Sequence, residues 1–112
     1  MSRTMDINKY TYQVSWSEED QEFVATVAEF PSLSWLASDR QEAENGLLEL
    51  VAEVVEDMTA SGEIIPESLG GRMYSGKFNV RTSPSIHRKM VIEAATEGIS
   101  LNTLINQKLA SA

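Results

Sequence analysis

The end of the chain, from about residue 76 to residue 112, predicts one strand and two short helices. A segment of about 40 residues rarely encloses enough core to fold alone, and it usually needs a metal, disulfides or a partner chain. The chain has no cysteine, which excludes disulfides and thiolate zinc sites, and its single histidine, His87, does not form a metal site unaided. No metal or other cofactor is therefore expected. The segment must therefore be stabilised by packing against the rest of its own chain or against another chain.

The elements of this segment follow the order strand, helix, glycine turn, helix. Lys77–Arg81 alternates polar and apolar residues, the period-two pattern of a strand. Ser83-Pro84 is a helix cap followed by proline at the first helical position, and Gly98 is a stop signal. Ser100 is a second cap, which predicts a second helix after a short turn.

The predicted strand has an apolar face, formed by Phe78 and Val80, and a polar face. Pairing with the same strand of a second copy satisfies its backbone groups and lets four helices cover the apolar face. The sequence therefore predicts an obligate dimer. Its expected core consists of the apolar residues of the strand and both helices: Phe78, Val80, Ile86, Met90, Leu101, Leu104 and Ile105.

The polar face of the paired strands predicts an interface for double-stranded DNA. A two-stranded ribbon fits the major groove, where Lys and Arg donate to guanine and Asn pairs with adenine. Lys77, Asn79 and Arg81 are therefore the expected base contacts. The expected phosphate contacts lie at the start of the second helix and on the first helix: Ser100, Asn102, Arg88 and Lys89.

The runs Lys77–Arg81, Ser83-Pro84 and Ser100-Leu101-Asn102, with Gly98 between the helices, resemble the ribbon-helix-helix family of the Arc and MetJ repressors. The resemblance implies a dimeric module that reads an operator with paired β-strands. A dimerisation module without DNA binding is the alternative.

The preceding part of the chain predicts an α+β layer. Lys9–Ser17 and Glu22–Ala28 alternate in hydropathy on either side of a polar turn, which indicates a hairpin, and Leu33–Ala37 is a third strand candidate. Asp39 is the expected cap of a long helix that ends near Gly62. One apolar stripe along this helix is expected to face the sheet: Ala43, Leu47, Leu50, Val51, Val54 and Met58.

The expected domain boundaries follow from composition. Residues 1–67 form an α+β domain with three to four antiparallel strands, the fourth being a short one at Ile64-Ile65. Residues 68–75, rich in glycine and serine, are the expected linker, and residues 76–112 form the dimeric module.

Charge divides the chain in a similar place. Residues 1–71 carry three bases and fifteen acids, a net charge of −12, whereas residues 72–112 carry six bases and two acids, a net charge of +4. Such a division suggests two surfaces with different partners, and random scatter of surface charge is the alternative. The acids lie in a turn or on the outer helix face, and none interrupts the apolar phase of a strand. A nucleic-acid-processing enzyme is therefore not expected.

The acidic part resembles the HicB antitoxin family. The resemblance lies in Tyr10–Val14, Phe23–Ala25, Glu29–Leu33, the Glu-rich helix and Gly62–Glu67. It implies a partial, inactive ribonuclease H-like fold that precedes a DNA-binding module.

Together the two resemblances imply a type II antitoxin. Such a protein neutralises a small basic, RNA-cleaving, HicA-like toxin and represses its own operon by binding operator DNA. The homodimer is expected, and pairing of dimers into tetramers stays open. Trp16 and Trp35 are candidate anchors for the toxin or members of the domain's own core. The alternative function is an orphan ribbon-helix-helix repressor with an accessory domain for assembly or ligand sensing.

A cytoplasmic location is expected. No apolar run approaches the roughly 18 residues that a membrane-spanning helix needs. The first residues also lack the apolar stretch of a signal peptide.

Overall fold

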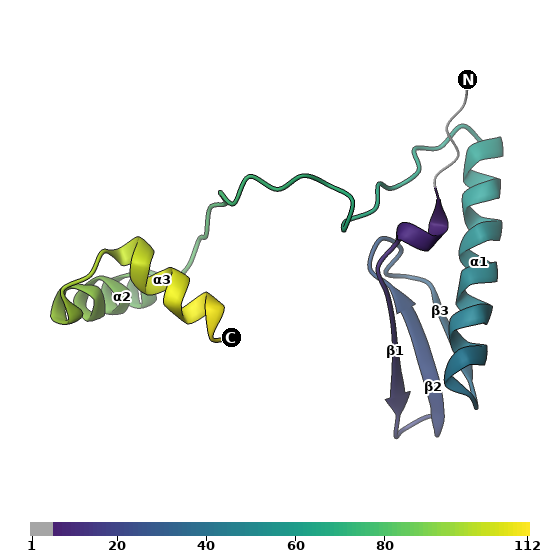
Figure 1. The fold of residues 1–112 in the computed structure, drawn as a ribbon, viewed down its shortest axis with the longest axis horizontal. Helices are drawn as coiled ribbons and strands as arrows, with labels where there is room; N and C mark the ends of the chain where they lie inside the picture. Colours follow the sequence, from purple (N-terminus) through teal and green to yellow (C-terminus); the bar gives the residue numbers. More distant parts are fainter. Residues whose placement is uncertain (1–5) are drawn as a thin grey trace. The chain divides into compact units, whose positions relative to one another are not determined.

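The computed structural model describes residues 6–112, which separate into two compact units, one ending at Tyr74 and the other spanning Ser75–Ala112 (Figure 1). The first contains a 3-10 helix, η1 (Ile7–Lys9), the strands β1 (Tyr12–Ser17), β2 (Glu22–Val27) and β3 (Ser34–Ala37), and the helix α1 (Arg40–Ala60). The second contains the helices α2 (Pro84–Glu97) and α3 (Leu101–Ala110). None of these helices is long and apolar enough to cross a membrane.

The first unit is an antiparallel sheet of order β1-β2-β3 with α1 on one face (Figure 1). The hairpin register runs without interruption from Tyr12 opposite Val27 to Ser17 opposite Glu22. This confirms the predicted α+β class and the three strands. The prediction of a possible fourth strand at Ile64-Ile65 is wrong, because the described residues form no strand there. Ile64 is exposed, and Ile65 packs against the core as irregular chain.

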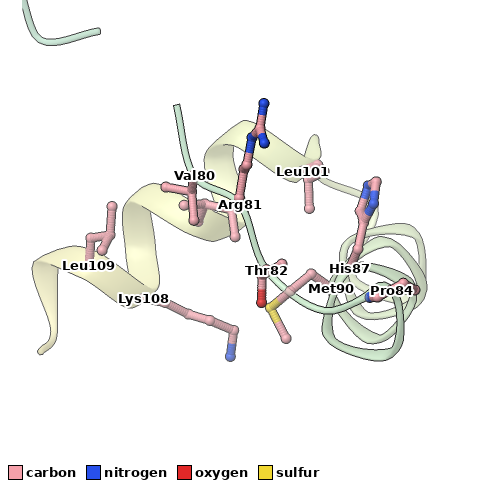
Figure 2. Close-up of a pocket in the computed structure, with 10 residues that line it drawn as sticks. Val80, Arg81, Thr82, Pro84, His87, Met90, Leu101, Lys108 and Leu109 are labelled. Carbon is pink, nitrogen blue, oxygen red and sulfur yellow. The ribbon is translucent and has the colours of Figure 1, made fainter. Parts of the chain in front are cut away.

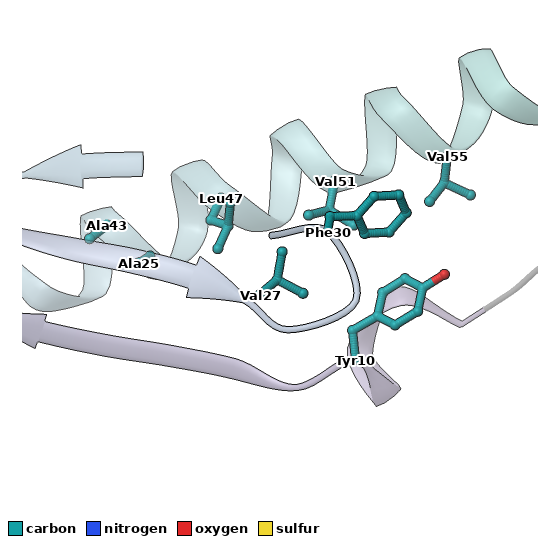
Figure 3. Close-up of a cluster of buried hydrophobic side chains, with 8 residues drawn as sticks. All are labelled: Tyr10, Ala25, Val27, Phe30, Ala43, Leu47, Val51 and Val55. Atoms are coloured by element: carbon teal, nitrogen blue, oxygen red, sulfur yellow. The ribbon is translucent and has the colours of Figure 1, made fainter. Parts of the chain in front are cut away.

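The core lies between the inner face of the sheet and α1 (Figure 3). The Asp39 carboxylate caps α1 by accepting the N–H groups of Gln41, at 3.1 Å, and Glu42, at 3.2 Å. The predicted stripe was right in most positions but missed Val55, since the sheet faces a row of α1 residues spaced by four. The buried residues of this core are Tyr10, Ala25, Val27, Phe30, Ala43, Leu47, Val51 and Val55.

The segment after α1 is tied back to the start of the sheet. The Tyr10 hydroxyl donates to the carbonyl of Pro66 at 2.7 Å, and the Ser68 hydroxyl donates to the carbonyl of Lys9 at 2.5 Å. Ser68 is buried although it is polar, which these bonds make possible. Ser68, the first residue of the expected linker at residues 68–75, is thus attached to the first unit.

Glu29 holds the same segment from the other side. Its carboxylate accepts the backbone N–H and the hydroxyl of Thr11, at 2.9 and 3.0 Å, and the backbone N–H of Leu69 at 2.9 Å. Burial raises the pKa of this carboxyl, but the hydrogen bonds from Leu69 and Thr11 lower the pKa by a larger amount. The resulting pKa lies below its usual value. The ionised form is therefore the one that holds the segment.

Replacing Glu29 with glutamine should weaken the first unit by about 1 kcal/mol at neutral pH, because one acceptor oxygen and the charge are lost. The folded-state pKa is depressed, so the contribution is present above the unfolded-state pKa of about 4.3 and is lost as pH falls through the folded-state value. Urea unfolding at fixed protein concentration from pH 7 to pH 3 should show the two proteins converging in stability. Glu53→Gln, on the exposed side of α1, is the control, and equal pH profiles for wild type and Glu29→Gln would contradict the assignment.

A glycine in the middle of α1 makes room for an indole ring. A Cβ atom built on Gly46 would lie 2.1 Å from Nε1 of Trp35 on β3. Any residue with a Cβ atom at position 46 would overlap the Trp35 ring. The close approach of Trp35 therefore explains a glycine inside a 21-residue helix, where it costs about 1 kcal/mol relative to alanine.

Gly46→Ala should displace the Trp35 ring and destabilise the first unit by about 1–3 kcal/mol, as overpacking does. Denaturant unfolding together with tryptophan fluorescence in a Trp16→Phe background reports both effects. In a Trp35→Ala background the same change should instead stabilise by about 1 kcal/mol, since only helix propensity remains. An equal effect of Gly46→Ala in both backgrounds would refute this packing.

Candidate nucleic-acid interface and acidic partner surface

The second unit is a pair of capped helices joined at a glycine. The Ser83 hydroxyl accepts the N–H of Ile86 at 3.3 Å, with Pro84 in the first turn of α2. Gly98 ends α2 with φ of +71°, a left-handed conformation that favours glycine. Ser100 begins α3. The predicted helices and the turn between them are therefore present.

This unit buries very little of its apolar surface. Within Ser75–Ala112 only Ala94, 3% exposed, and Leu104, 2% exposed, are buried side chains. Phe78 and Val80 are 72% and 68% exposed. Of the other residues expected in a dimer core, Ile86 is exposed, and Met90, Leu101 and Ile105 are half-buried. One copy of the chain leaves most of the expected core open.

Four of these residues, Val80, Met90, Leu101 and Ile105, line a groove between α2, α3 and the chain that precedes α2. Figure 2 shows its lining. Its volume is ≈ 670 Å³. Polar groups at its rim include His87 and Lys108, and Lys108 also forms an ion pair with Glu93 at 3.1 Å. The apolar part of the lining consists of Val80, Pro84, Met90, Leu101, Ile105 and Leu109.

The segment expected to be a DNA-reading strand is irregular in a single copy. In the part of the chain that the structure describes, residues 77–81 pair with no other strand. Within residues 6–112 their backbone forms one hydrogen bond, from the Lys77 N–H to the Ser75 hydroxyl at 3.1 Å. A strand without a neighbour forms no ladder, and the sequence predicts pairing of this segment only with a second copy. The expected base contacts Lys77, Asn79 and Arg81 are all exposed.

The expected phosphate contacts are exposed as well. The Ser100 hydroxyl accepts the N–H of Thr103 at 3.0 Å and donates to the Thr103 hydroxyl at 2.8 Å, so it acts as an ordinary cap. The N–H groups of Leu101 and Asn102, in the first turn, have no acceptor inside the helix. The basic residues expected near phosphates, Arg88 and Lys89, are exposed on α2.

In the acidic unit, the two tryptophans lie on the edge strands of the sheet. Trp16 on β1 is 46% exposed, contacts Phe23 edge-to-face at 5.1 Å and donates from Nε1 to Glu18 at 2.8 Å. Trp35 on β3 is 43% exposed and lies against Gly46. Each ring packs on its own unit and still exposes almost half of its surface.

Sequence reasoning missed Arg40. Its guanidinium lies 5.1 Å from the centre of the Phe23 ring, and Nη1 donates to the carbonyl of Val14 at 3.0 Å. The sequence predicts a cap at Asp39 but carries no signal that the next side chain reaches across to β1. Within residues 6–112 no group of three or more acidic or histidine side chains is placed to hold a metal ion.

Comparison with protein families gives a match over the C-terminal part of the chain. Residues 63–109 match the model of the HicB family, and this region contains the segment after α1, all of α2 and nearly all of α3. No curated protein and no solved structure matches the chain. The match supports a relationship to the HicB family and, through it, to toxin–antitoxin proteins. It covers the region that resembles ribbon-helix-helix proteins, whereas the HicB-like motifs of the sequence lie mainly before it.

Phe78→Ala should break the dimer that we expect through residues 76–82 and both C-terminal helices. Truncating a side chain enclosed in such a core costs about 3–5 kcal/mol. Sedimentation velocity of the full chain at micromolar concentration should show a dimer for the wild type and a shift to monomer for the variant. Lys77→Ala changes the opposite face of the same strand and should remain dimeric. A folded wild-type monomer under these conditions would disprove the dimer.

Proposed function

We propose that the protein is an antitoxin of the HicB family, which neutralises a small, basic, RNA-cleaving toxin and represses its own operon. The observation that carries this proposal is the HicB family match over residues 63–109, where two capped helices follow the basic segment at residues 77–81. We further propose that the chain has no catalytic activity of its own.

DNA binding is assigned to the second unit as a dimer. Its exposed apolar residues, its groove and its unpaired segment at residues 77–81 all fit a second copy that supplies an antiparallel strand and two more helices. The paired strands then present Lys77, Asn79 and Arg81 twice to the major groove. The net charge of +4 over residues 72–112 supports contact with phosphates.

Toxin binding is assigned to the first unit. Its net charge of −12 over residues 1–71 repels DNA and attracts a basic ribonuclease. Opposed charge mainly speeds encounter and selects partners, and buried apolar contacts supply most of the affinity. Trp16 and Trp35, each nearly half exposed, are suited to supply them.

An orphan repressor is the second candidate. The observation in its favour is that the family match does not extend over the sheet and α1. In that case the first unit would serve assembly or ligand sensing. An adjacent reading frame for a small basic protein favours the antitoxin, and its absence favours the orphan repressor.

Alanine at Lys77, Asn79 and Arg81 together should abolish operator binding while the full chain still neutralises the toxin. Each lost base contact costs about 1–3 kcal/mol, counted once per chain of the dimer. A gel-shift titration measures operator affinity, and growth of cells that also express the adjacent basic protein measures neutralisation.

Arg88→Ala/Lys89→Ala is the matched control. Its loss of phosphate contacts should weaken binding to all DNA sequences and flatten the dependence on salt. Unchanged operator affinity in the triple variant would rule out the assigned reading strand. Loss of growth rescue by a folded triple variant would show that the two activities do not lie in separate units.

A further inference from the structure

The strand β1 forms an unprotected edge of the sheet. Among residues 6–112 it pairs only with β2, and its six residues stay in register without a bulge. None of the residues from Tyr12 to Ser17 is charged or proline. Edge strands normally carry such features, which prevent them from pairing with other chains. The other edge, β3, has only four residues and leads directly into α1.

The hydrogen-bonding groups that point outward from this edge follow from the register. The N–H of Ala28 donates to the carbonyl of Thr11 at 3.0 Å. In an antiparallel ladder, bonding alternates along the strand, so Tyr12, Val14 and Trp16 direct their N–H and carbonyl groups away from β2. The bond from Arg40 to the Val14 carbonyl reaches the strand from this outer side. Three residues of β1 are thus arranged to pair with another strand.

Arg40 does not close this edge. It engages one carbonyl oxygen, which has a second lone pair, and it leaves the three outward N–H groups untouched. Trp16, at the end of the same edge, supplies an exposed indole whose other side rests against Phe23. The edge therefore combines main-chain pairing groups with an aromatic side chain that is already held in place.

We propose that the free edge of β1 is the docking site for an extended basic segment of a partner protein, which adds as a fourth strand of the sheet. An exposed edge recognises a strand because main-chain hydrogen bonds supply the affinity. The negative charge of the first unit determines which kind of strand can pair with this edge. The turn that follows β1 exposes Glu18, Glu19 and Asp20, and a second copy of this unit would bring another −12. A basic chain is attracted where a second copy is repelled.

This inference rests on the proposed function, in which the basic partner is the toxin. The test uses the full chain and the small basic product of the adjacent reading frame. Val14→Pro removes one outward N–H and no bond to β2, and proline is tolerated at such edge positions. Binding should weaken roughly 10- to 100-fold, since a carbonyl of the incoming strand loses its donor. Val14→Ala removes more of the side chain but keeps the N–H, and it should bind nearly as tightly as the wild type.

Hydrogen exchange gives a second readout that a general loss of stability would not imitate. In the complex the amides of Tyr12, Val14 and Trp16 should become protected, whereas those of Gln13 and Ser15 are already protected by β2 in the free protein.

A complex that forms without this alternating protection, or with equal affinity for Val14→Pro, overturns the docking site and leaves the proposed function standing. A change in oligomeric state on Val14→Pro without the partner identifies a second copy as the occupant and also overturns it. Failure of the wild type to bind the basic protein removes both the proposed function and this inference.

Discussion

The second unit depends on apolar side chains that it does not cover by itself. Ordering the backbone of residues 77–81 costs about 1–2 kcal/mol for each residue. Burying Phe78 and Val80 returns only about 1.5–3 kcal/mol each. The strand is therefore not expected to form unless the same event also closes the groove between α2 and α3 and completes a ladder of backbone bonds. Strand formation, core closure and dimerisation are then one coupled process.

The first unit has no such dependence. Eight buried side chains fill the space between the sheet and α1, and the segment through Leu69 is fastened by Tyr10, Ser68 and Glu29. A unit with its own closed core presents the same surface at any protein concentration. In the proposed function DNA binding, by contrast, requires the dimer, so its apparent affinity is expected to depend on chain concentration. Under the proposed function, neutralisation persists at concentrations where repression fails.

The sequence predicts those features that depend on neighbouring residues. Strand phase in β1 and β2 and the caps at Asp39, Ser83, Gly98 and Ser100 follow from local rules, and the structure has them all. Features that join distant residues escaped prediction. The fit of Trp35 against Gly46 is one example, and the bond from Ser68 to Lys9 is another, since neither partner carries a local signal for the other. The strand predicted at residues 77–81 belongs to a third kind, because its proposed pairing needs a chain other than its own.

The negative charge of the first unit also explains how the β1 edge avoids pairing with the β1 edge of a second copy. The strand β1 lacks the charge, proline or bulge that usually keeps edges apart. Repulsion between two units of net charge −12 opposes the approach of a second edge, and this repulsion acts before any backbone bond can form. A lysine on the strand would repel a basic chain. Negative charge spread over the whole unit instead leaves the edge open to a basic chain. Under the proposed function, the same charge opposes pairing of two β1 edges and leaves the edge open to the basic partner.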